Sequence, residues 1–490
     1  MIEMLLLIPL AATFLLYPLR HRRAVELLSV TASAITLAAA AYLAYTVYAV
    51  GTIDEGLLYM DMLSAYVVLL IAFVGLAANL YSVSYLGWEL REGTIGAAKL
   101  RNFHLFFQLF IFTMVLVGVS DNLGIMWIAI EGTTLASAYL VGFYDRDTSV
   151  EAAWKYLIIC SVGITLALLG TVLLYASSVS FLGEASDALS WSTLMDPAVL
   201  ANLDVDLLRI AFILVLVGYG TKVGLAPMHT WLPDAHSQAP TPVSALLSAV
   251  LLNCAMYGIL RFHLILSGSA LGPGFSGGLL LLFGILSLAT AAAFIVLSKD
   301  YKRMLAYSSI EHMGIIAIGF GIGGPLAVMG ALFHMLNHAL TKTLLFFGAG
   351  NVLQRYGTRE IGGVKGLAAV MPTTAMLVAG GALAIVGCPP FATFLSEIMI
   401  LVGAVDSGDY LAAALYLGLL AVVFAALLYH AGRMLFGEAP ADVERREVGR
   451  WRPVLMAGLL AAVAVLGIYM PDVLEGALER MVSLFTGGAS

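Results

Sequence analysis

Apolar runs long enough to cross a lipid bilayer follow one another along almost the whole chain. A membrane-spanning helix needs about 20 consecutive, mostly apolar residues, and we count 14 such runs in the 490 residues. With 61% hydrophobic and only 11% charged residues, the chain does not have the composition of a soluble globular protein. The sequence therefore predicts an all-α integral membrane protein with 14 transmembrane helices. The runs are centred near residues 11, 37, 75, 111, 132, 165, 216, 252, 287, 313, 338, 388, 421 and 462.

The positions of the basic residues predict how the chain is oriented. If the amino terminus lies outside, the loops that follow odd-numbered runs face the cytoplasm, and these loops contain 19 of the 24 lysine and arginine residues. Cytoplasmic loops of membrane proteins carry such an excess of positive charge. We therefore expect one polytopic membrane domain over residues 1–490, with both termini outside.

Two short segments repeat the same pattern far apart in the chain. Pro227–Asp234 and Pro390–Glu397 both read Pro-x-x-Thr-aromatic-Leu-x-acid, and both lie in spans that proline interrupts, runs 7 and 12. A weaker similarity joins Ala129–Glu131 in run 5 to Ser309–Glu311 in run 10. Each pair is an odd number of spans apart, so the two copies cross the membrane in opposite directions. Inverted repeats with broken helices are typical of ion and solute transporters.

Lys222 and Glu131 are ionisable residues inside apolar runs. A lysine at the centre of a membrane span costs roughly 3 kcal/mol or more, so such residues are rare unless they have a function. Glu131 alone could stay protonated and hydrogen-bond a neighbouring helix. Because two buried groups of opposite charge stabilise each other, we expect Lys222 and Glu131 to form an ion pair.

His334, His338 and Lys342 are spaced four residues apart in run 11, which places them along one stripe of a helix. Histidine titrates near neutral pH and can accept and donate protons. Two hydrogen-bonded core histidines are the alternative. Three ionisable groups on one intramembrane stripe favour a proton relay. Haem ligation is excluded, because residues four apart on one helix cannot bind opposite faces of the ring.

Glu397 follows the Pro389-Pro390 pair in the broken run 12. Proline leaves backbone groups of a helix unpaired, and water can then reach them. We expect Glu397 to be the last residue of the relay, although an interfacial carboxylate is the simpler interpretation.

Further polar residues near the two breaks are candidates for auxiliary roles. A polar hinge after Lys222 could admit protons from the cytoplasm, and a surface loop is the alternative there. An acid–histidine pair in run 10 could equally pair with nearby basic residues at the membrane interface. These candidate entry or auxiliary residues are His229, Asp234, His236, Glu311 and His312.

No cofactor or metal site is expected from the sequence. Cys160, Cys254 and Cys388 are far apart and form no metal-ligand spacing. The chain contains no phosphate-binding glycine loop and no motif that pairs a nucleophile with a base.

The segment Gly220–His236, GTKVGLAPMHTWLPDAH, followed by PVSALLS at 242–248, resembles the signature of the antiporter-like subunits of complex I and of multisubunit cation/proton antiporters. The resemblance extends from about residue 60 to 435. It implies 14 helices and two inverted five-helix repeats with broken helices 7 and 12. Three helices would occupy about 1–100, the repeats about 101–265 and 275–435, and the last helix and tail 436–490.

The same resemblance implies roles for the residues singled out above. Glu131 and Lys222 match the family's essential ion pair, and Glu397 matches its exit residue. His334, His338 and Lys342 match its relay helix.

Two differences from the usual family pattern indicate which branch of the family this chain resembles. Many members carry a lysine where this chain has Asn253, and a serine where it has Glu311. With the segment SSIEHMG at 308–314, this combination is most similar to component F of hydrogenase-4 and formate-hydrogenlyase-type complexes. Asn253 has no titratable proton, so this link of the relay would have to pass through water or histidine.

The resemblance implies a proton-translocating, non-redox subunit of a complex-I-like assembly in a prokaryotic cytoplasmic (inner) membrane. The closest fit is a membrane-bound nickel-iron hydrogenase. The expected partners are other membrane subunits, hydrogenase-like peripheral subunits and membrane lipid, with no nucleic acid and no cofactor of its own. The alternatives are a sodium/proton antiporter subunit, an antiporter-like subunit of an NADH–quinone reductase, an independent solute transporter and a passive scaffold.

Overall fold

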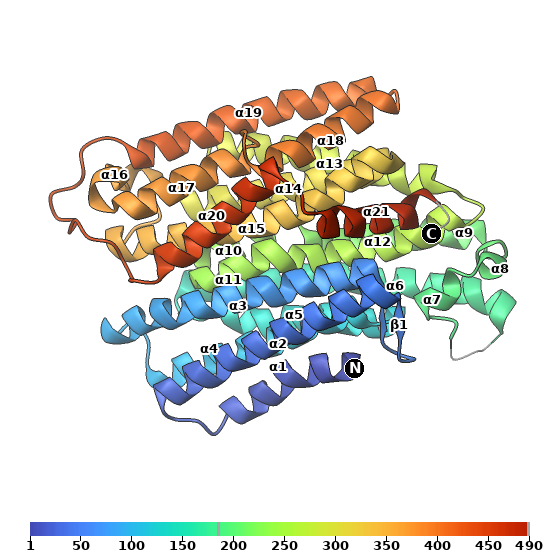
Figure 1. Ribbon diagram of the computed structural model, residues 1–490, viewed down its shortest axis with the longest axis horizontal. Helices are drawn as coiled ribbons and strands as arrows, with labels where there is room; N and C mark the ends of the chain where they lie inside the picture. The colour runs from blue at the N-terminus through green and yellow to red at the C-terminus, as the bar shows by residue number, and fades with distance from the viewer. Residues whose placement is uncertain (184–186, 488–490) are drawn as a thin grey trace.

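The protein is a bundle of helices whose long axes run mostly in one direction (Figure 1). The computed structural model describes residues 1–183 and 187–487. Within these residues the only β-sheet is a two-stranded antiparallel hairpin of β1 (Ile53–Asp54) and β2 (Tyr59–Met60). The all-α membrane architecture expected from the apolar runs is therefore confirmed.

Six helices form the first part of the bundle. Side-chain caps begin two of them: Asp61 accepts the backbone N–H of Ser64 at the start of α3, and Asn122 accepts those of Gly124 and Ile125 at the start of α5. The six helices are α1 (Ile2–Leu16), α2 (Arg22–Val50), α3 (Met62–Arg91), α4 (Ala97–Val119), α5 (Leu123–Val141) and α6 (Asp147–Leu182).

The next part of the chain contains the first broken helix. Helix α9 stops at Gly224, whose φ of 82° is a left-handed conformation that favours glycine, and the chain turns through Pro227 before α10 begins. A π-helical turn, η1 (Leu247–Leu251), then joins α11 to α12. The helices here are α7 (Trp191–Leu194), α8 (Pro197–Leu200), α9 (Val205–Val223), α10 (Trp231–Gln238), α11 (Thr241–Leu246) and α12 (Leu252–Gly268).

The second broken helix lies between α17 and α18, at Pro389 and Pro390. Both breaks contain a cis X–Pro peptide bond, Ala226–Pro227 and Pro389–Pro390. The remaining elements are α13 (Pro273–Val296), α14 (Tyr301–Ile322), α15 (Gly324–Tyr356), the 3-10 turn η2 (Ile361–Gly363), α16 (Leu367–Val370), α17 (Pro372–Ile385), α18 (Ala392–Asp406), α19 (Tyr410–Leu435), α20 (Arg452–Ile468) and α21 (Asp472–Thr486).

Among the described residues, nine helices are long and apolar enough to cross a membrane, or ten if α20 and α21, bent by 73°, are one span. Thirteen of the 14 predicted runs are centred on helices, and the centre of run 12, near residue 388, lies in the break between α17 and α18. Several of these helices do not meet the criteria for a span. Helices α1 and α17 are short, with 15 and 14 residues. Helix α15 has 33 residues but carries the polar stripe from His334 to Lys342. The structure thus supports a polytopic membrane bundle without fixing the number of spans at fourteen.

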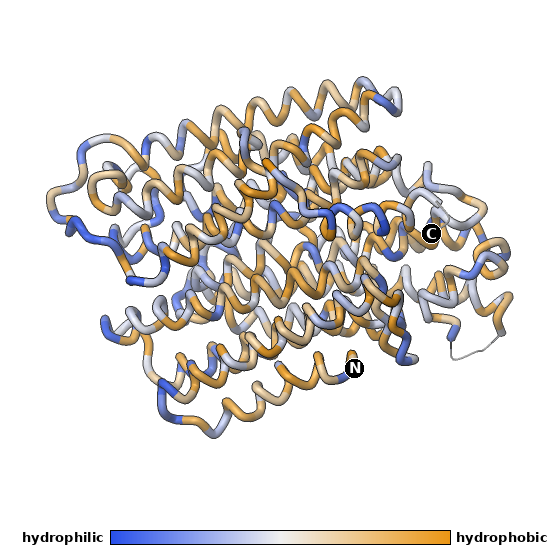
Figure 2. The backbone as a smooth tube through the Cα atoms, viewed as in Figure 1, coloured by the Kyte–Doolittle hydropathy of each residue, from blue (hydrophilic) through white to orange (hydrophobic). Residues whose placement is uncertain are grey.

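Hydrophobic residues cover the helices, and hydrophilic ones gather mainly at the ends and in the α19–α20 connection (Figure 2). The peripheral helices α6, α13 and α19 bury 39%, 39% and 28% of their most apolar stretch, whereas the span Thr241–Gly268 is buried completely. Helices α12, α14 and α15 therefore form the interior of the bundle. Their polar side chains are shielded from lipid by the surrounding helices.

Candidate functional site

Lys222 lies at the carboxyl end of α9 and is fully buried. Its Nζ donates hydrogen bonds to Thr134 Oγ1 at 2.8 Å and to Tyr156 OH at 2.6 Å. The same ammonium group lies 4.6 Å from the centre of the Tyr156 ring. The helix end, the two hydroxyls and the aromatic face all stabilise a positive charge here.

Small residues bring α6 and α9 close enough to form this environment. A Cβ placed on Gly218 would lie 2.5 Å from the backbone nitrogen of Ala167, and a Cβ on Gly163 would lie 2.6 Å from Cβ of Thr221. Glycine is thus required at both positions for the two helices to pack at this distance. The close packing carries Tyr156 of α6 to Lys222 of α9.

Glu131 is connected to Lys222 through Thr134. The Thr134 hydroxyl accepts the hydrogen bond from Lys222 and donates to Glu131 Oε2 at 3.2 Å, while Ser161 donates to Glu131 Oε1 at 2.6 Å. No direct ion pair within 4.0 Å joins Lys222 to Glu131 in the described part of the chain. A hydroxyl bridge therefore stands in place of the expected direct contact, because Thr134 lies one turn after Glu131 on α5 and its hydroxyl bonds both groups.

Glu131 is only half-buried and lies near the outer surface of the bundle. Its neighbours on α5, Ile128 and Leu135, are 60% and 61% exposed. Lys222 faces the interior, whereas the carboxylate of Glu131 lies beside an apolar face that lipid or another subunit would cover. The site thus extends from the protein interior to its intramembrane surface.

The π-helical turn η1 and the start of α12 make polar contacts with the second half of the chain. The carbonyl of Ser248 lies 3.1 Å from His338 Nε2, and the Ser248 hydroxyl lies 2.7 Å from the hydroxyl of Ser309 on α14. Asn253 donates to the carbonyls of Ala249 and Met335 at 2.8 and 3.4 Å. Polar contacts therefore run from α11–α12 to both α14 and α15.

Helix α15 carries the predicted relay residues His334, His338 and Lys342, all fully buried. Lys342 Nζ donates to the carbonyl of Leu305 on α14 at 2.9 Å. Glu311, also on α14 and 2% exposed, interacts electrostatically with Lys342. The carboxylate that acts on the second lysine is thus buried, and no ion pair within 4.0 Å joins the two groups among the described residues.

His312 of α14 completes the histidine chain. Its Nδ1 lies 2.8 Å from His334 Nε2, and His334 Nδ1 lies 2.9 Å from the hydroxyl of Ser396. The rings of His312 and His338 are 5.2 Å apart. His312 is fully buried, and its ring packs against those of His334 and His338. This placement does not fit the alternative in which His312 pairs with basic residues at the membrane interface.

Glu397 lies at the end of this histidine chain, 7% exposed, and its Oε1 has no hydrogen-bond partner among the described residues. The carboxylate occupies the space in front of Gly387, where a Cβ would collide with it. The second break is therefore shaped around Glu397. One nitrogen or oxygen from each of His312, His334 and Glu397 lies within 4.8 Å of the others. The sequence did not predict this cluster, whose two imidazoles are hydrogen-bonded to each other.

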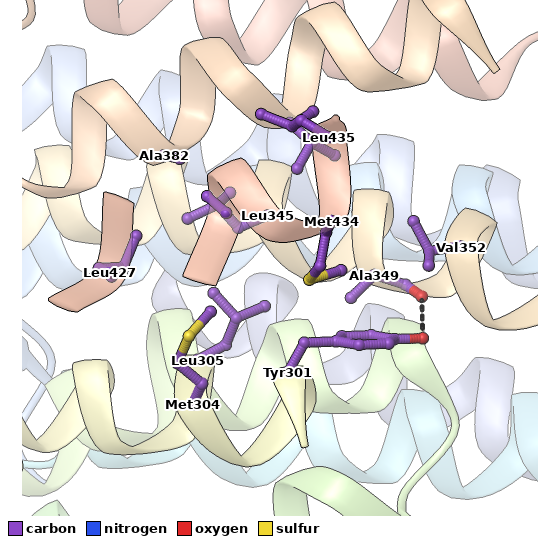
Figure 3. Close-up of a pocket in the computed structure, with 12 residues that line it drawn as sticks. Tyr301, Met304, Leu305, Leu345, Ala349, Val352, Ala382, Leu427, Met434 and Leu435 are labelled. Atoms are coloured by element: carbon purple, nitrogen blue, oxygen red, sulfur yellow. Dashed lines mark hydrogen bonds between the residues drawn. The ribbon is translucent and has the colours of Figure 1, made fainter. Parts of the chain in front are cut away.

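An apolar pocket of about 40 Å³ lies behind Leu305, the backbone partner of Lys342, between α14, α15, α17 and α19 (Figure 3). The hydroxyl of Tyr301 is its main polar group and donates to the carbonyl of Ala349 at 3.3 Å. On this side the relay is sealed from lipid by hydrocarbon. The polar contacts of Lys342 and its neighbours therefore continue toward the histidines rather than toward α19.

Comparison with known proteins places the chain in a family. Residues 120–425 match the model described as NADH:quinone oxidoreductase/Mrp antiporter, transmembrane. The hydrogenase-4 component F homolog of Methylacidiphilum infernorum is 42% identical over 84% of this chain and 85% of that protein. NADH-quinone oxidoreductase subunit N of Desulforudis audaxviator is 33% identical over 84% and 80% of the two chains.

The chain belongs to the NADH:quinone oxidoreductase/Mrp antiporter family.

Solved structures share the fold of this chain. A chain of the membrane-bound sulfane sulfur reductase, an archaeal respiratory membrane complex, superposes with a TM-score of 0.86 at 23% identity, covering 99% of this chain and 97% of that one. A chain of the Mrp complex from Dietzia sp. DQ12-45-1b gives 0.86 at 19% identity, covering 98% and 96%. Both are subunits of multisubunit membrane assemblies.

The three candidate residues in the polar hinge after Lys222 lie in different environments. Asp234 is at the surface and pairs with Lys155 at 3.2 Å and with Arg303 at 2.5 Å. His229, 9% exposed, packs beside Tyr307. His236 is fully buried, and neither ring nitrogen has a hydrogen-bond partner in the described chain. The structure thus buries His236 most deeply of the three and leaves Asp234 in a surface ion-pair network.

Several ionisable residues lie inside the protein although the sequence did not predict it. Arg452 is 1% exposed and donates to Asn351 and Gln354 at 3.0 and 2.7 Å. Glu89 and Lys302 are 4% and 1% exposed. All three lie near the ends of apolar runs, where the sequence alone does not separate an interfacial side chain from one folded inward.

Asp61 and Arg261 form a buried ion pair. Arg261 donates to the two carboxylate oxygens at 2.8 and 2.6 Å and stacks 3.7 Å from the ring of Trp191. Burial by itself would raise the pKa of Asp61, but the charge and hydrogen bonds of Arg261 outweigh it and lower the pKa below its ordinary value. This pair joins α3 to α12 and is structural.

Proposed function

We propose that this chain is a proton-translocating membrane subunit of a complex-I-like redox assembly of the membrane-bound nickel-iron hydrogenase type. The observation that carries the proposal is the hydroxyl bridge from buried Lys222 through Thr134 to Glu131 at the intramembrane surface. A lysine buried so deeply, with its carboxylate facing outward, can respond to charge on a neighbouring subunit. The 42% identity to a hydrogenase-4 component F homolog supports this type of assembly.

The proposed architecture has 14 transmembrane helices and two inverted five-helix repeats, with helices 7 and 12 broken. Three helices occupy about 1–100, the repeats about 101–265 and 275–435, and a last helix and tail 436–490. The matching breaks at Pro227 and Pro390 support the repeat. Both termini lie outside a prokaryotic cytoplasmic membrane, in agreement with the excess of lysine and arginine in the opposite loops.

The proposed cycle is electrostatic. Lys222 takes up a proton from the cytoplasmic side and is stabilised by Glu131 through Thr134. A charge change in the neighbouring subunit draws the Glu131 carboxylate away, which favours the neutral form of Lys222. The released proton passes by way of Ser248 and water to His338, then through His312 and His334 to Glu397. Pumping also requires that two states of the protein alternate.

Lys342 and Glu311 have a supporting role in this cycle. A positive Lys342 next to the histidines disfavours a second proton there, and the negative Glu311 offsets this effect. Asn253 holds α12 against α15 without titrating. The proton therefore crosses the middle of the chain through histidines and water.

Replacing Lys222 tests the proposed function. In the intact complex, in sealed membrane vesicles, Lys222→Ala is expected to leave assembly and electron transfer largely intact while lowering coupled proton transport about tenfold or more. Lys155→Ala is the matched control, because Lys155 is an exposed lysine in a surface ion pair. Wild-type pumping by the Lys222 variant would remove the mechanism and would favour a passive scaffold.

A sodium/proton antiporter subunit is the second candidate. It is favoured by the family description and by a 34% identical match to one component of the Na(+)/H(+) antiporter of Alkalihalophilus pseudofirmus, a protein of which this chain spans 42%. Transport that depends on sodium at constant pH would support this candidate. Purification of the chain alone, without hydrogenase-like partners, would instead favour an independent transporter.

A further inference from the structure

A polar cavity of about 630 Å³ opens at the end of the bundle that holds the predicted cytoplasmic loops. It is formed by the carboxyl ends of α3 and α15, the turn between α10 and α11, and the loops that precede α6 and α14. Its lining includes Arg146, Lys299, Arg303 and Arg359 together with Asp300 and Glu360. A cavity of this size and polarity holds water.

Glu89 lies at the inner end of this cavity. It is 4% exposed, its Oε1 accepts a hydrogen bond from Tyr144 OH at 2.5 Å, and its Oε2 has no partner among the described residues. Tyr85 OH lies 3.2 Å from the Tyr144 hydroxyl. A buried carboxylate oxygen without a donor is costly, so a proton or water on Oε2 would relieve the site.

Lys302 also lines the cavity and extends inward from it. Its ammonium group, 1% exposed, donates to the carbonyl of Ala239 at 2.7 Å. Ala239 ends the helix that carries His236. His236 in turn interacts electrostatically with both Lys302 and Lys342. Between the cavity wall and the relay helix α15 there is therefore one titratable imidazole.

We propose that Glu89 is a second proton-entry residue, which supplies the histidine chain from the cavity while Lys222 takes up its own proton, that Lys302 positions Glu89 electrostatically, and that His236 receives the proton from Glu89. A hydronium ion of the cavity transfers a proton to Glu89 Oε2 and becomes water. The new O–H bond then breaks as the proton passes through water to the unprotonated ring nitrogen of His236, and His236 gives it to the His338 side of the relay. No other reactant is consumed. This inference deepens the proposed function and rests on it.

The groups that face Glu89 set how readily it exchanges protons. Tyr144 donates to the carboxylate, and Tyr85 lies beside it. Lys302 and Arg452 are the cations that act on it. The two cations favour the charged carboxylate, whereas burial favours the protonated one. Opposing influences of this kind suit a group that must both accept and release a proton.

Glu89→Gln in the whole complex tests the proposal. We expect proton transport to fall about tenfold at unchanged electron transfer, whereas Glu89→Asp should restore most of it. Glu360→Gln is the matched control, because Glu360 lines the same cavity but is exposed. Difference infrared spectra should show a protonated carboxyl band that disappears in Glu89→Gln.

The outcomes separate this proposal from the proposed function. If Glu89→Gln pumps like the wild type while Lys222→Ala does not, the entry proposal is overturned and the proposed function stands. If both variants pump like the wild type, the proposed function itself fails. If Glu89→Gln does not assemble, the wild-type complex and Glu89→Asp decide. A carboxyl band that responds to cytoplasmic pH and shifts in Glu89→Asp supports the proposal. A band that is the same in Glu89→Asp overturns it, because the band then belongs to another residue.

Discussion

The two lysines of the candidate site, Lys222 and Lys342, are both fully buried, but their surroundings differ. Lys222 is bonded to two hydroxyls, and its carboxylate partner lies half-buried at the surface. Lys342 is bonded to a backbone carbonyl, and its carboxylate partner is enclosed. The first site is thus open to influence from outside the chain, whereas the second is insulated.

This difference suits the two lysine sites to separate tasks. A surface carboxylate can be moved or neutralised by a neighbouring subunit, so the Lys222 site is suited to receive a signal. A chain of histidines sealed by hydrocarbon keeps its protons from leaking to lipid or solvent, so the Lys342 site is suited to conduct. Four substitutions test this difference between the two lysine sites, and they follow in order of decreasing effect on transport.

Removal of the second lysine should have the largest effect on transport. Lys342→Met leaves Glu311 and three histidines without the cation that orders their protons, so coupled transport should fall about tenfold or more. The measurement is proton uptake per electron transferred in sealed vesicles. Lys365→Met, an exposed lysine, is the control. If Lys342→Met alters only the response to the neighbouring subunit, the assignment of roles to the two sites is reversed.

Loss of the hydroxyl bridge should have the next largest effect. Thr134→Val keeps the shape of the side chain but removes the hydroxyl between Lys222 and Glu131. The loss of this bridge costs about 1.5 kcal/mol, so coupled proton transport should slow by roughly tenfold at most. The matched control is Thr133→Val, because Thr133 is also buried but donates to the carbonyl of Ile130. An unchanged ratio of protons to electrons in Thr134→Val would show that Glu131 acts on Lys222 without the bridge.

A new charge between the two sites should have a smaller effect. Asn253→Lys places an ammonium group where the amide now bonds Met335 of the relay helix. We expect coupled transport to decrease about twofold, because the added charge repels a proton on its way to His338. Asn253→Met separates the loss of the amide from the added charge. A rise in coupling in Asn253→Lys would contradict this account.

The smallest effect on transport is expected from the structural ion pair. Asp61→Asn leaves Arg261 buried without its counter-charge, which costs about 3–5 kcal/mol of stability, but the pair touches neither lysine site. Thermal denaturation of the purified complex should occur at a lower temperature, while transport per assembled complex should be unchanged. Asp54→Asn, at an exposed position in the hairpin, is the control.

The same pair gives a pH dependence with a definite sign. Because the pKa of Asp61 is lower in the folded protein than in the unfolded chain, its contribution to stability is complete above the unfolded-state pKa and is lost as the pH falls through the folded-state pKa. Near neutral pH the contribution of Asp61 is therefore fully present, and the stability that it supplies does not change with pH. A loss of the Asp61 contribution on raising the pH would contradict the assignment.

Much of the candidate site was predictable because a charge within an apolar run is conspicuous. Lys222, Glu131, His334, His338 and Lys342 were found in this way, and the structure places all but Glu131 fully inside the bundle. Glu89, Lys302 and Arg452 were not found. They lie near span ends, where one turn of a helix decides whether a side chain meets water or the interior.

Sequence alone determined that this chain is a membrane protein, where its apolar runs lie and which intramembrane residues can titrate. These properties follow from composition and order along the chain, because lipid tolerates few polar side chains wherever they occur. The tertiary structure decided which groups meet: that Thr134 separates Lys222 from Glu131, that His312 lies between His334 and His338, and that a polar cavity ends at Glu89. Such contacts join helices far apart in the chain, so their packing angles and not their spacing set the distances.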